Sequence, residues 1–292
     1  MSDVQTLKQQ RTKLFEDTYN NIIPERVPIG VNMCIEAVAE FGGLSVRDVN
    51  WNPPSVMPAA NEICQKVYSD ICPANVYNAR FPGFYEMSKS KSFKMASSGF
   101  VQHPEISGME IEDYDYLIEK PFDCMLERVM PRLYGGFASG NPLETAVSMA
   151  KTIAIMNGDI FASFGLMAKL NEQYGYHADN GMARAMTTAP FDFLADQLRG
   201  FSKISTDMRR MPEKVLAACE ALYPLMVHAG IPKVKTPYSR AFSFTHMATF
   251  MRGKDFEKFW WPTFLRMCNA HASMGIQTDT FCEDDWTRYL DY

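Results

Sequence analysis

The hydrophobic pattern of this chain is clearest between residues 240 and 286, where it predicts a strand, a helix and a second strand. Short apolar runs lie at 241–244 and at 276–281. Between them, mostly apolar side chains recur three or four positions apart, so they share one face of a helix predicted from Asp255 to Met274. This face carries Phe256, Trp260, Phe264, Met267, His271 and Met274. A strand–helix–strand unit favours parallel strands, because an antiparallel pair needs only a short turn.

The ends of this predicted helix carry residues suited to start and stop it. Asp255 can cap the first turn, and Gly275 can adopt the left-handed conformation that ends many helices. Pro262 lies inside the pattern and predicts a kink or a restart of the helix at that point.

Polar residues follow both strands of this unit. His246 comes directly after the first strand, and Glu283, Asp284 and Asp285 come after the second. Parallel strands of a β/α barrel bring such residues to one edge, where active sites are built. We therefore predict a shared mouth with His246 and Glu283 as candidate catalytic residues. A lone histidine is more often structural, and Asp284 or Asp285 can instead cap a helix starting at Trp286, so these alternatives stay open.

Two further strands and a long helix are predicted elsewhere in the chain. Val27–Met33 is predicted as the first strand, with Asn32 near its end, and Met182–Thr188 as a later one. Asp192 follows that later strand and is either a substrate ligand or a helix cap. Residues 141–174 predict a long helix that begins at an Asn-Pro pair. Its apolar stripe, predicted to face the core, consists of Leu143, Val147, Ala150, Ala154, Phe161, Phe164 and Met167.

Composition and charge narrow the class of protein. The 292 residues suffice for one large domain or two small ones, and 47% of them are apolar, so a sizeable core can form. A net charge of −5 without a basic block argues against nucleic acid as a partner. No uninterrupted run approaches the roughly 18 apolar residues of a membrane span, so no membrane partner is expected.

Cysteine usage predicts the compartment. The seven cysteines include no Cys-x-x-Cys pair, which is typical of reduced thiols in a cytoplasmic protein. Cys282, at the end of the last predicted strand, is either a contact for a soft metal or a thiol, or a buried structural cysteine.

Five stretches of the chain stand out as strings with a family likeness. They are Thr188–Gly200, Met211–Val215, His246–Met251, Phe256–Pro262 and the region from Gln102–Glu105 to Pro131–Arg132. Together they resemble the uroporphyrinogen decarboxylase superfamily, which includes porphyrinogen decarboxylases and corrinoid-dependent methyltransferases. The resemblance covers residues 25–292 and implies a TIM (β/α)8-type barrel, preceded by an N-terminal helical extension over residues 1–24. It also implies an active site at the carboxyl ends of the barrel strands.

The resemblance allows two activities to be compared. In the decarboxylases, arginines after the first strand are expected to hold the substrate's carboxylates, because a guanidinium group matches a carboxylate fork. The corresponding stretch here, Ile29–Cys34, contains no arginine, and Asp196 stands where the family has a tyrosine. The family's catalytic aspartate falls either on Asp70 or on the position of Asn75. These departures disfavour decarboxylation of uroporphyrinogen.

The methyltransferase branch is expected to use zinc, which turns a thiol into a thiolate, with ligands that include a His-x-Cys pair. No His-x-Cys string occurs in this chain. The pattern supplies about six strands where a closed barrel of this type needs eight. We therefore expect a barrel that is incomplete at its C-terminus, without metal ligands in this chain. Zinc is expected only if a missing C-terminal part supplies them.

The leading prediction is an α/β enzyme that moves a methyl group between methylcobamide, held by a corrinoid protein, and a thiol or methylated small molecule. His246 is the predicted proton donor or acceptor, and Glu283 its metal or proton partner. The predicted binding residues are Asn32, Asp192, Asp70 and Cys282. One alternative is a uroporphyrinogen-type decarboxylase of porphyrin biosynthesis. Another is a non-catalytic module that binds a tetrapyrrole or a partner protein. A homodimer is a further possibility.

Overall fold

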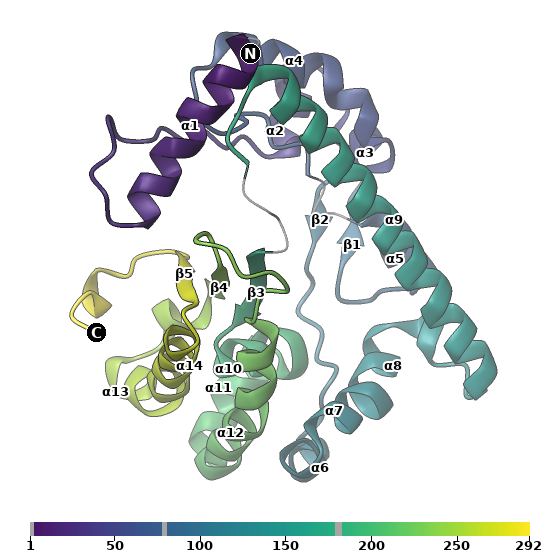
Figure 1. Cartoon of the computed structure of the whole chain (residues 1–292). Helices are drawn as coiled ribbons and strands as arrows, with labels where there is room; N and C mark the ends of the chain where they lie inside the picture. Colours follow the sequence, from purple (N-terminus) through teal and green to yellow (C-terminus); the bar gives the residue numbers. More distant parts are fainter. Residues whose placement is uncertain (1–2, 78–80, 179–182) are drawn as a thin grey trace. The chain divides into compact units, whose positions relative to one another are not determined.

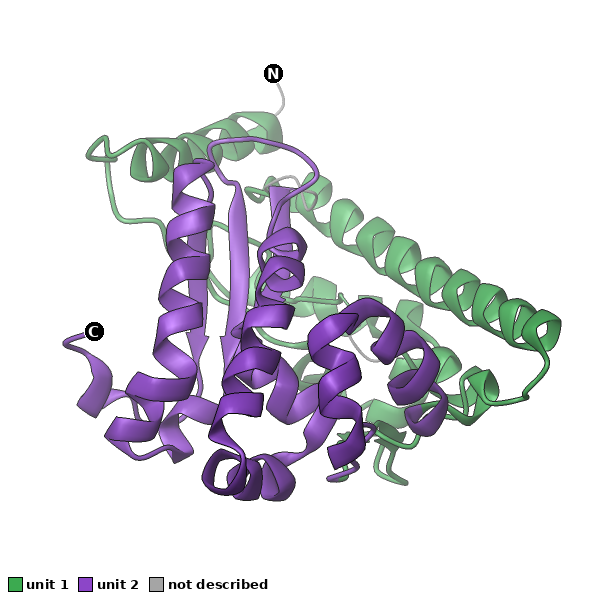
Figure 2. Cartoon of the chain, turned by 90° about the horizontal axis from the view of Figure 1, so that it is seen from below, with its two compact units in different colours: residues 1–104, 134–179 green, residues 105–133, 180–292 purple. Residues whose placement is uncertain are grey.

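The computed structural model describes residues 3–77, 81–178 and 183–292 (Figure 1). The chain forms two compact units, shown in different colours in Figure 2. Unit 1 comprises residues 1–104 and 134–179, and unit 2 comprises residues 105–133 and 180–292. Helices and strands are mixed, as expected for the α/β class. Within the described residues the strands form two small sheets and do not close a barrel.

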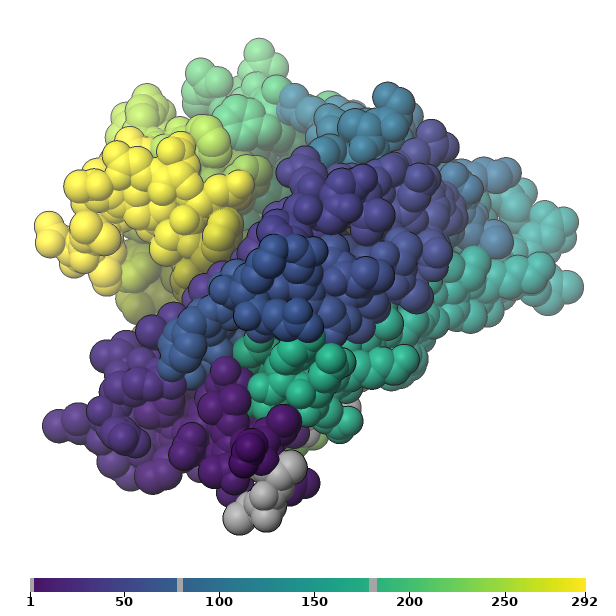
Figure 3. Space-filling view, turned by 90° about the horizontal axis from the view of Figure 1, so that it is seen from above, coloured from purple at the N-terminus to yellow at the C-terminus, as the bar shows by residue number. Residues whose placement is uncertain are grey.

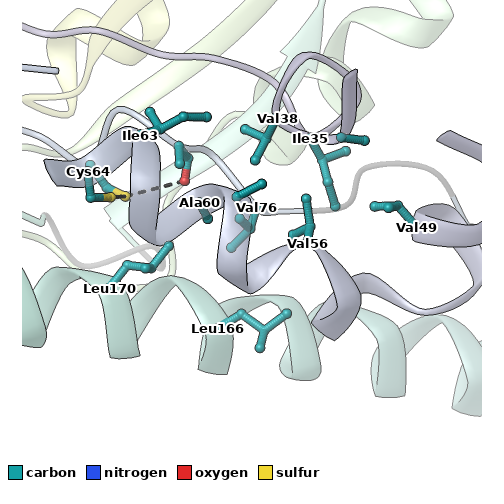
Figure 4. Packing of buried hydrophobic residues seen from close by; sticks show 14 of the residues in the cluster. Ile35, Val38, Val49, Val56, Ala60, Ile63, Cys64, Val76, Leu166 and Leu170 are labelled. Atoms are coloured by element: carbon teal, nitrogen blue, oxygen red, sulfur yellow. Dashed lines mark hydrogen bonds between the residues drawn. The ribbon is translucent and has the colours of Figure 1, made fainter. Parts of the chain in front are cut away.

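Unit 1 is mainly helical. Its helices are α1 (Asp3–Tyr19), α2 (Ile35–Phe41), α3 (Val46–Trp51), α4 (Met57–Lys66), α5 (Pro82–Met87) and α9 (Pro142–Tyr174). Strands β1 (Lys94–Met95) and β2 (Val101–Gln102) pair antiparallel. Side chains from α2, α3, α4 and the inner side of α9 pack into one buried apolar cluster (Figure 4). Its members include Val38, Val49, Ala60, Ile63, Leu166 and Leu170.

The first predicted strand, Val27–Met33, is not a regular strand in the structure. Its last residue forms an isolated parallel bridge with Ala74, and Met33 N donates to Pro73 O at 2.8 Å. Pro28 and Pro73 have no N–H group to donate, so a continuous ladder cannot form between these segments. The alternating apolar pattern therefore identified an extended segment but overestimated its pairing.

The long predicted helix is α9, and its ends are those expected. Asn141 Oδ1 accepts hydrogen bonds from the backbone N–H groups of Leu143 and Glu144, which caps the first turn. Gly175 ends the helix with a φ of 63°, a left-handed conformation that glycine adopts without strain.

The prediction that the apolar stripe of α9 faces the core is wrong for all of its members except Met167, which packs against the buried cluster. Leu143 and Phe161 are 73% and 72% exposed, and Val147 and Phe164 are exposed as well. The face that packs onto unit 1 instead carries Thr152, Ser163, Leu166 and Leu170. A helical period identifies which residues share a face, but it does not identify what covers that face.

By length and composition, α9 is able to cross a membrane, because an 18-residue window within its 33 residues has a mean hydropathy of 1.3. This corrects the expectation that no segment approaches a span. That expectation counted uninterrupted apolar runs, and Asn157 and Asp159 interrupt the run in α9. Only 17% of the window is buried, and the buried side of the helix packs against α1, α4 and α5.

Unit 2 contains a parallel sheet with helices between its strands. The strands β3 (Arg184–Thr188), β4 (Arg240–Thr245) and β5 (Gln277–Cys282) pair in that order. The helices are α6 (Tyr114–Glu119), α7 (Pro121–Cys124), α8 (Met130–Leu133), α10 (Pro190–Asp192), α11 (Phe201–Arg210), α12 (Pro212–Ala229), α13 (Gly253–Asp255) and α14 (Trp261–Ser273). The predicted strand–helix–strand unit with parallel strands is therefore confirmed. Of the predicted strand Met182–Thr188, Met182 lies outside the described residues.

One face of this sheet is covered by helices, and the other face is exposed. Helices α12 and α14 pack on one face (Figures 1 and 2), where Thr187 Oγ1 donates to Met226 O of α12 at 2.7 Å. The opposite face carries large apolar side chains that remain exposed: Met186 at 61%, Phe244 at 43% and Phe281 at 52%. Parallel register places Phe244 beside Phe281, so these rings share one surface of the sheet.

The helix predicted from Asp255 to Met274 consists of three segments. It begins at Gly253 with α13, passes through a π-helical turn, η8 (Phe256–Trp260), and continues as α14. Asp255 is not the cap, and its Oδ2 instead accepts a hydrogen bond from Arg252 Nε at 2.7 Å. The π-helical turn ends just before Pro262, which donates no N–H, and so marks the predicted restart. Gly275 has the predicted left-handed conformation, with a φ of 72°.

Candidate active site

The polar residues that follow β4 and β5 lie next to one another. Parallel register pairs Thr245 with Cys282, and Glu283 N donates to Thr245 O at 3.3 Å. One residue further along, His246 Nε2 lies 3.9 Å from Glu283 Oε2. The two segments that the sequence placed at one edge of the sheet therefore meet there, as parallel strands require.

His246 is held between two carboxylates. Its Nδ1 lies 3.1 Å from Oδ2 of Asp196, which comes from the π-helical turn η6 (Phe193–Arg199) after β3. This hydrogen bond, reinforced by the charges of Asp196 and Glu283, raises the pKa of His246 to about 9. The imidazole is therefore protonated at neutral pH. Its side chain is 45% exposed, so a small molecule can reach it.

Asp192 lies beneath His246 and is 1% exposed. Its Oδ1 accepts hydrogen bonds from Met247 N at 3.0 Å and from Trp260 Nε1 at 2.9 Å, while Oδ2 accepts one from His246 N at 3.2 Å. Burial, together with the nearby charge of Asp196, raises the pKa of Asp192 to about 7. Asp192 thus ties the turn that bears His246 to the helix after it. It is a positioning residue, and its carboxylate does not cap the helical segment that follows it towards Gly200 but accepts from the first N–H groups of the 3-10 turn Met247–Phe250.

Asp196 and Trp260 complete this cluster, but the sequence did not identify either as a site residue. Asp196 follows Asp192 by four positions in a helical segment, which places both carboxylates on one side. That spacing is the feature of the sequence from which Asp196 could have been identified as a site residue. Trp260 was predicted only as a core residue, and its indole N–H could be matched to Asp192 only once the fold was known.

The residues around Glu283 take different roles. Cys282 is exposed at the end of β5, so the alternative of a buried structural cysteine is wrong. The Glu283 side chain is 56% exposed. Asp285 Oδ1 accepts a hydrogen bond from Thr287 N at 2.8 Å and so caps the turn that follows. Asp284 occupies a left-handed conformation with a φ of 65°.

Asn32 and Asp70 belong to unit 1 and are described within it. Asn32 is exposed in the extended segment before α2. The carboxylate of Asp70 is fully buried and accepts two hydrogen bonds from Arg26, both at 2.6 Å, and one from Ile29 N at 2.8 Å. Burial opposes ionisation, but Arg26 and the Ile29 N–H outweigh it and hold the pKa of Asp70 below its usual range. Asp70 is thus a structural ion-pair residue of unit 1.

Replacing Asp70 with asparagine is expected to lower the free energy of unfolding by about 2 kcal/mol at pH 7, because Arg26 and Arg11 lose their buried partner. A lowered pKa contributes stability above the unfolded pKa, which is lost as the pH falls through the folded value. Urea unfolding at pH 7 and pH 3 measures this, and the difference between the variant and the native chain should be smaller at pH 3 than at pH 7. Glu62→Gln, which breaks an exposed pair with Lys66, is the control and should cost less than about 0.5 kcal/mol.

Replacing Asp196 with asparagine is expected to move the pKa of His246 from about 9 down towards its ordinary value of 6.5. The amide removes the charge that stabilises the imidazolium ion. Titration of the histidine ring protons by NMR measures the change. Glu283→Gln should move the same pKa less, because its carboxylate lies farther away, at 3.9 Å from Nε2. An Asp196 variant with an unchanged His246 pKa contradicts the geometry described above.

Within residues 3–77, 81–178 and 183–292, no group of three or more His, Cys, Asp or Glu side chains is arranged to hold a metal ion. A surface hollow of about 660 Å³ lies at the other end of β5, lined by residues that include Cys268, Gly275 and Asp279. It does not include His246 or its partners.

Comparison with known proteins adds no family to these observations. No protein-family model matches the chain, and a search of curated proteins finds no match.

Proposed function

We propose that this chain supplies the active-site edge of a β/α-barrel enzyme that removes a methyl group from a small molecule and passes it to the corrinoid of a partner protein. The observation that carries the proposal is the position of His246 between Asp196 and Glu283, at the carboxyl ends of parallel strands. Barrel enzymes build their active sites at this edge. In the proposal, His246 is the residue that transfers a proton.

The protonation state of His246 favours one direction of transfer. When a methyl group leaves an oxygen or nitrogen, that atom keeps the electron pair of the broken bond and needs a proton. The cobalt of the reduced corrinoid supplies the pair for the new bond. With a pKa raised to about 9 by Asp196, His246 carries the required proton at neutral pH. Transfer to a thiol needs a base instead, so we assign a methylated substrate as the donor.

The exposed face of the sheet supports an apolar body for this substrate. Phe244 and Phe281 are neighbours on that face, with ring centroids 6.4 Å apart, and they precede His246 and Glu283 by two positions each. Exposed aromatic rings stack on planar apolar groups. A methoxylated aromatic compound fits both requirements, because its ring can lie on the phenylalanines while its oxygen meets His246.

Partners and compartment follow from the same proposal. The corrinoid arrives on a partner protein as a substrate, and a reducing cytoplasm suits both its reduced cobalt and the seven free cysteines. Because the described residues offer no ligand set for zinc, no step of the proposal passes through that metal.

A specific observation supports decarboxylation as a second candidate. Arg184, which is exposed, and Arg240, which is buried, lie at the amino ends of β3 and β4, opposite the end that carries His246, and guanidinium groups bind carboxylates. Both arginines are already paired with Asp279, through contacts of 3.5 Å and 3.1 Å. A carboxylated substrate would have to displace Asp279, so this candidate ranks below methyl transfer.

The test supplies the whole chain with cob(I)alamin and 2-methoxyphenol as probes. Methylcobalamin formation is followed by absorbance, and catechol by mass spectrometry. Appearance of both products at equal rates supports the proposal. A parallel reaction with uroporphyrinogen measures carbon dioxide, and release there without methyl transfer favours the decarboxylase. Absence of both reactions, with tetrapyrrole binding retained, overturns both enzymes and leaves a non-catalytic binding module.

A further inference from the structure

The exposed stripe of α9 follows a heptad repeat. Apolar or small residues recur at alternating intervals of four and three positions, and every one of them is exposed. The residues of this seam are Leu143, Val147, Ala150, Ala154, Asn157, Phe161, Phe164 and Ala168. A spacing that averages 3.5 residues keeps a helix in contact with another helix along its length. The pattern therefore points to a helical partner rather than to an irregular surface.

Most of the seam lies away from the side of α9 that packs onto unit 1, although Phe164 also contacts that unit, with its ring centroid 5.2 Å from that of Tyr77. Leu166 and Leu170 point into the buried cluster of unit 1 (Figure 4), whereas Phe161 is 72% exposed. In the space-filling view the teal residues of α9 form part of the molecular surface (Figure 3). The helix is thus held in place by one face and presents the other.

Two glycines beside the seam leave room for a second helix. A Cβ atom added at Gly158 or Gly165 would meet nothing within 4 Å. Glycine inside a helix costs about 1 kcal/mol relative to alanine, and it is favoured where another backbone approaches closely. The two glycines therefore lower the stability of the helix, and close packing of a partner helix would offset that loss.

We propose that this seam is a self-association surface, on which α9 packs antiparallel against α9 of a second copy of the chain. Side-chain sizes support this orientation. Phe164 and Ala150 lie seven positions either side of Asn157. A two-fold axis at Asn157 therefore sets each large ring against a small alanine, whereas a parallel pair sets phenylalanine against phenylalanine.

Charge and polarity agree with the antiparallel pair. Glu144 and Lys169 are exposed and lie almost equally far from Asn157, on opposite sides. An antiparallel pair brings Glu144 of one copy towards Lys169 of the other at both ends, whereas a parallel pair brings like charges together. Asn157 meets its own counterpart at the axis, and a single polar residue in an apolar seam fixes the register of such pairs.

A lipid bilayer is the rival occupant of this face, and the observations disfavour it. The stretch of α9 between Lys151 and Lys169, residues 152–168, is only as long as the shortest membrane spans, about 17 residues. It also contains Asn157 and Asp159. Asn157 is exposed on the seam itself, where lipid chains would leave its amide without a hydrogen-bond partner, whereas Asp159 lies on the side of the helix that faces Gly83 of α5.

The first experiment measures the mass of the whole chain in solution by light scattering after gel filtration. A dimer at micromolar concentration is expected, and Phe161→Glu should convert it to a monomer with unchanged circular dichroism. Ile23→Glu, at a residue of unit 1 that is 94% exposed, is the matched control and should leave the dimer intact. A monomeric native chain, or a dimer unaffected by Phe161→Glu, overturns the proposal.

A second experiment tests the orientation and the rival. In a background without the exposed cysteines Cys34 and Cys282, Ala150→Cys mixed with Phe164→Cys should form a disulfide-linked heterodimer. Ala150→Cys alone should not cross-link. Cross-linking of Ala150→Cys to itself overturns the antiparallel arrangement. Flotation with vesicles of phosphatidylcholine and phosphatidylglycerol provides the last arm, and a monomer that floats with them identifies a membrane surface and overturns self-association.

Discussion

Replacing His246 with glutamine is expected to lower kcat/KM for the proposed demethylation by roughly 10²- to 10⁴-fold, the range that a positioned general acid contributes. Glutamine keeps a hydrogen-bonding group near Asp196 but has no proton to give to a departing oxygen. The side chain is 45% exposed, so the variant should remain folded. Initial rates of methylcobalamin formation from 2-methoxyphenol measure the effect.

The pH dependence of the demethylation rate tests the role of His246 independently. His246 acts in its protonated form, so the rate of the native enzyme should fall as the pH rises through about 9. His228→Gln is the matched control, because this histidine is exposed in the last turn of α12, and its rate should equal that of the native chain. A His246→Gln variant that keeps both the native rate and its alkaline fall would exclude His246 as the acid.

The edge of the sheet in unit 2 could be predicted from the sequence because it depends on local pattern and on chain direction alone. Two apolar runs separated by an amphipathic helix favour parallel strands, and parallel strands place the residues after them side by side. His246 and Glu283 met for that reason. The prediction needed no knowledge of the rest of the fold.

The partners of His246 could not be predicted in the same way. Asp196 approaches it from a turn after β3, fifty positions earlier, and only the pairing of β3 with β4 brings the two together. From the sequence, Asp192 was either a substrate ligand or a helix cap, and in the structure it is a positioning residue for the turn that bears His246. Burial decides that role, and burial depends on contacts between segments far apart in the chain.

In unit 1, two predictions failed because a pattern along the chain does not show which surfaces surround a segment. The spacing of apolar residues correctly identified a helix at α9 and an extended segment at Val27–Met33. Whether a face is covered depends on the surfaces around it, and whether an extended segment pairs depends on the N–H groups of its neighbour. Asp70 was one of two positions, with Asn75, on which the resemblance placed the family's catalytic aspartate. It forms an ion pair with Arg26, because its surroundings, and not its residue type, decide its role.

Replacing Asp192 with alanine is expected to lower the free energy of unfolding by about 3 to 4 kcal/mol, the largest loss of stability among the changes considered. Three donors lose their acceptor at a site where Asp192 is 1% exposed: the indole N–H of Trp260 and the backbone N–H groups of His246 and Met247. Urea unfolding, with the NMR shift of the Trp260 indole proton as a local probe, measures the loss. Asp115→Ala, at an exposed surface pair with Lys214, should cost less than about 0.5 kcal/mol.

Asp192→Asn separates the hydrogen bonds from the charge. The amide oxygen can still accept from Trp260, so this variant should lose less stability than the alanine variant. Because asparagine does not titrate, the free energy of unfolding of this variant should also lack the pH dependence that Asp192 gives the native chain. The folded pKa of Asp192 is raised to about 7, so its contribution to stability is greatest at low pH and declines as the pH rises towards that value. An alanine variant that costs under about 1 kcal/mol would show that the three donors find other acceptors. The turn bearing His246 would then be held by its own backbone and not by Asp192.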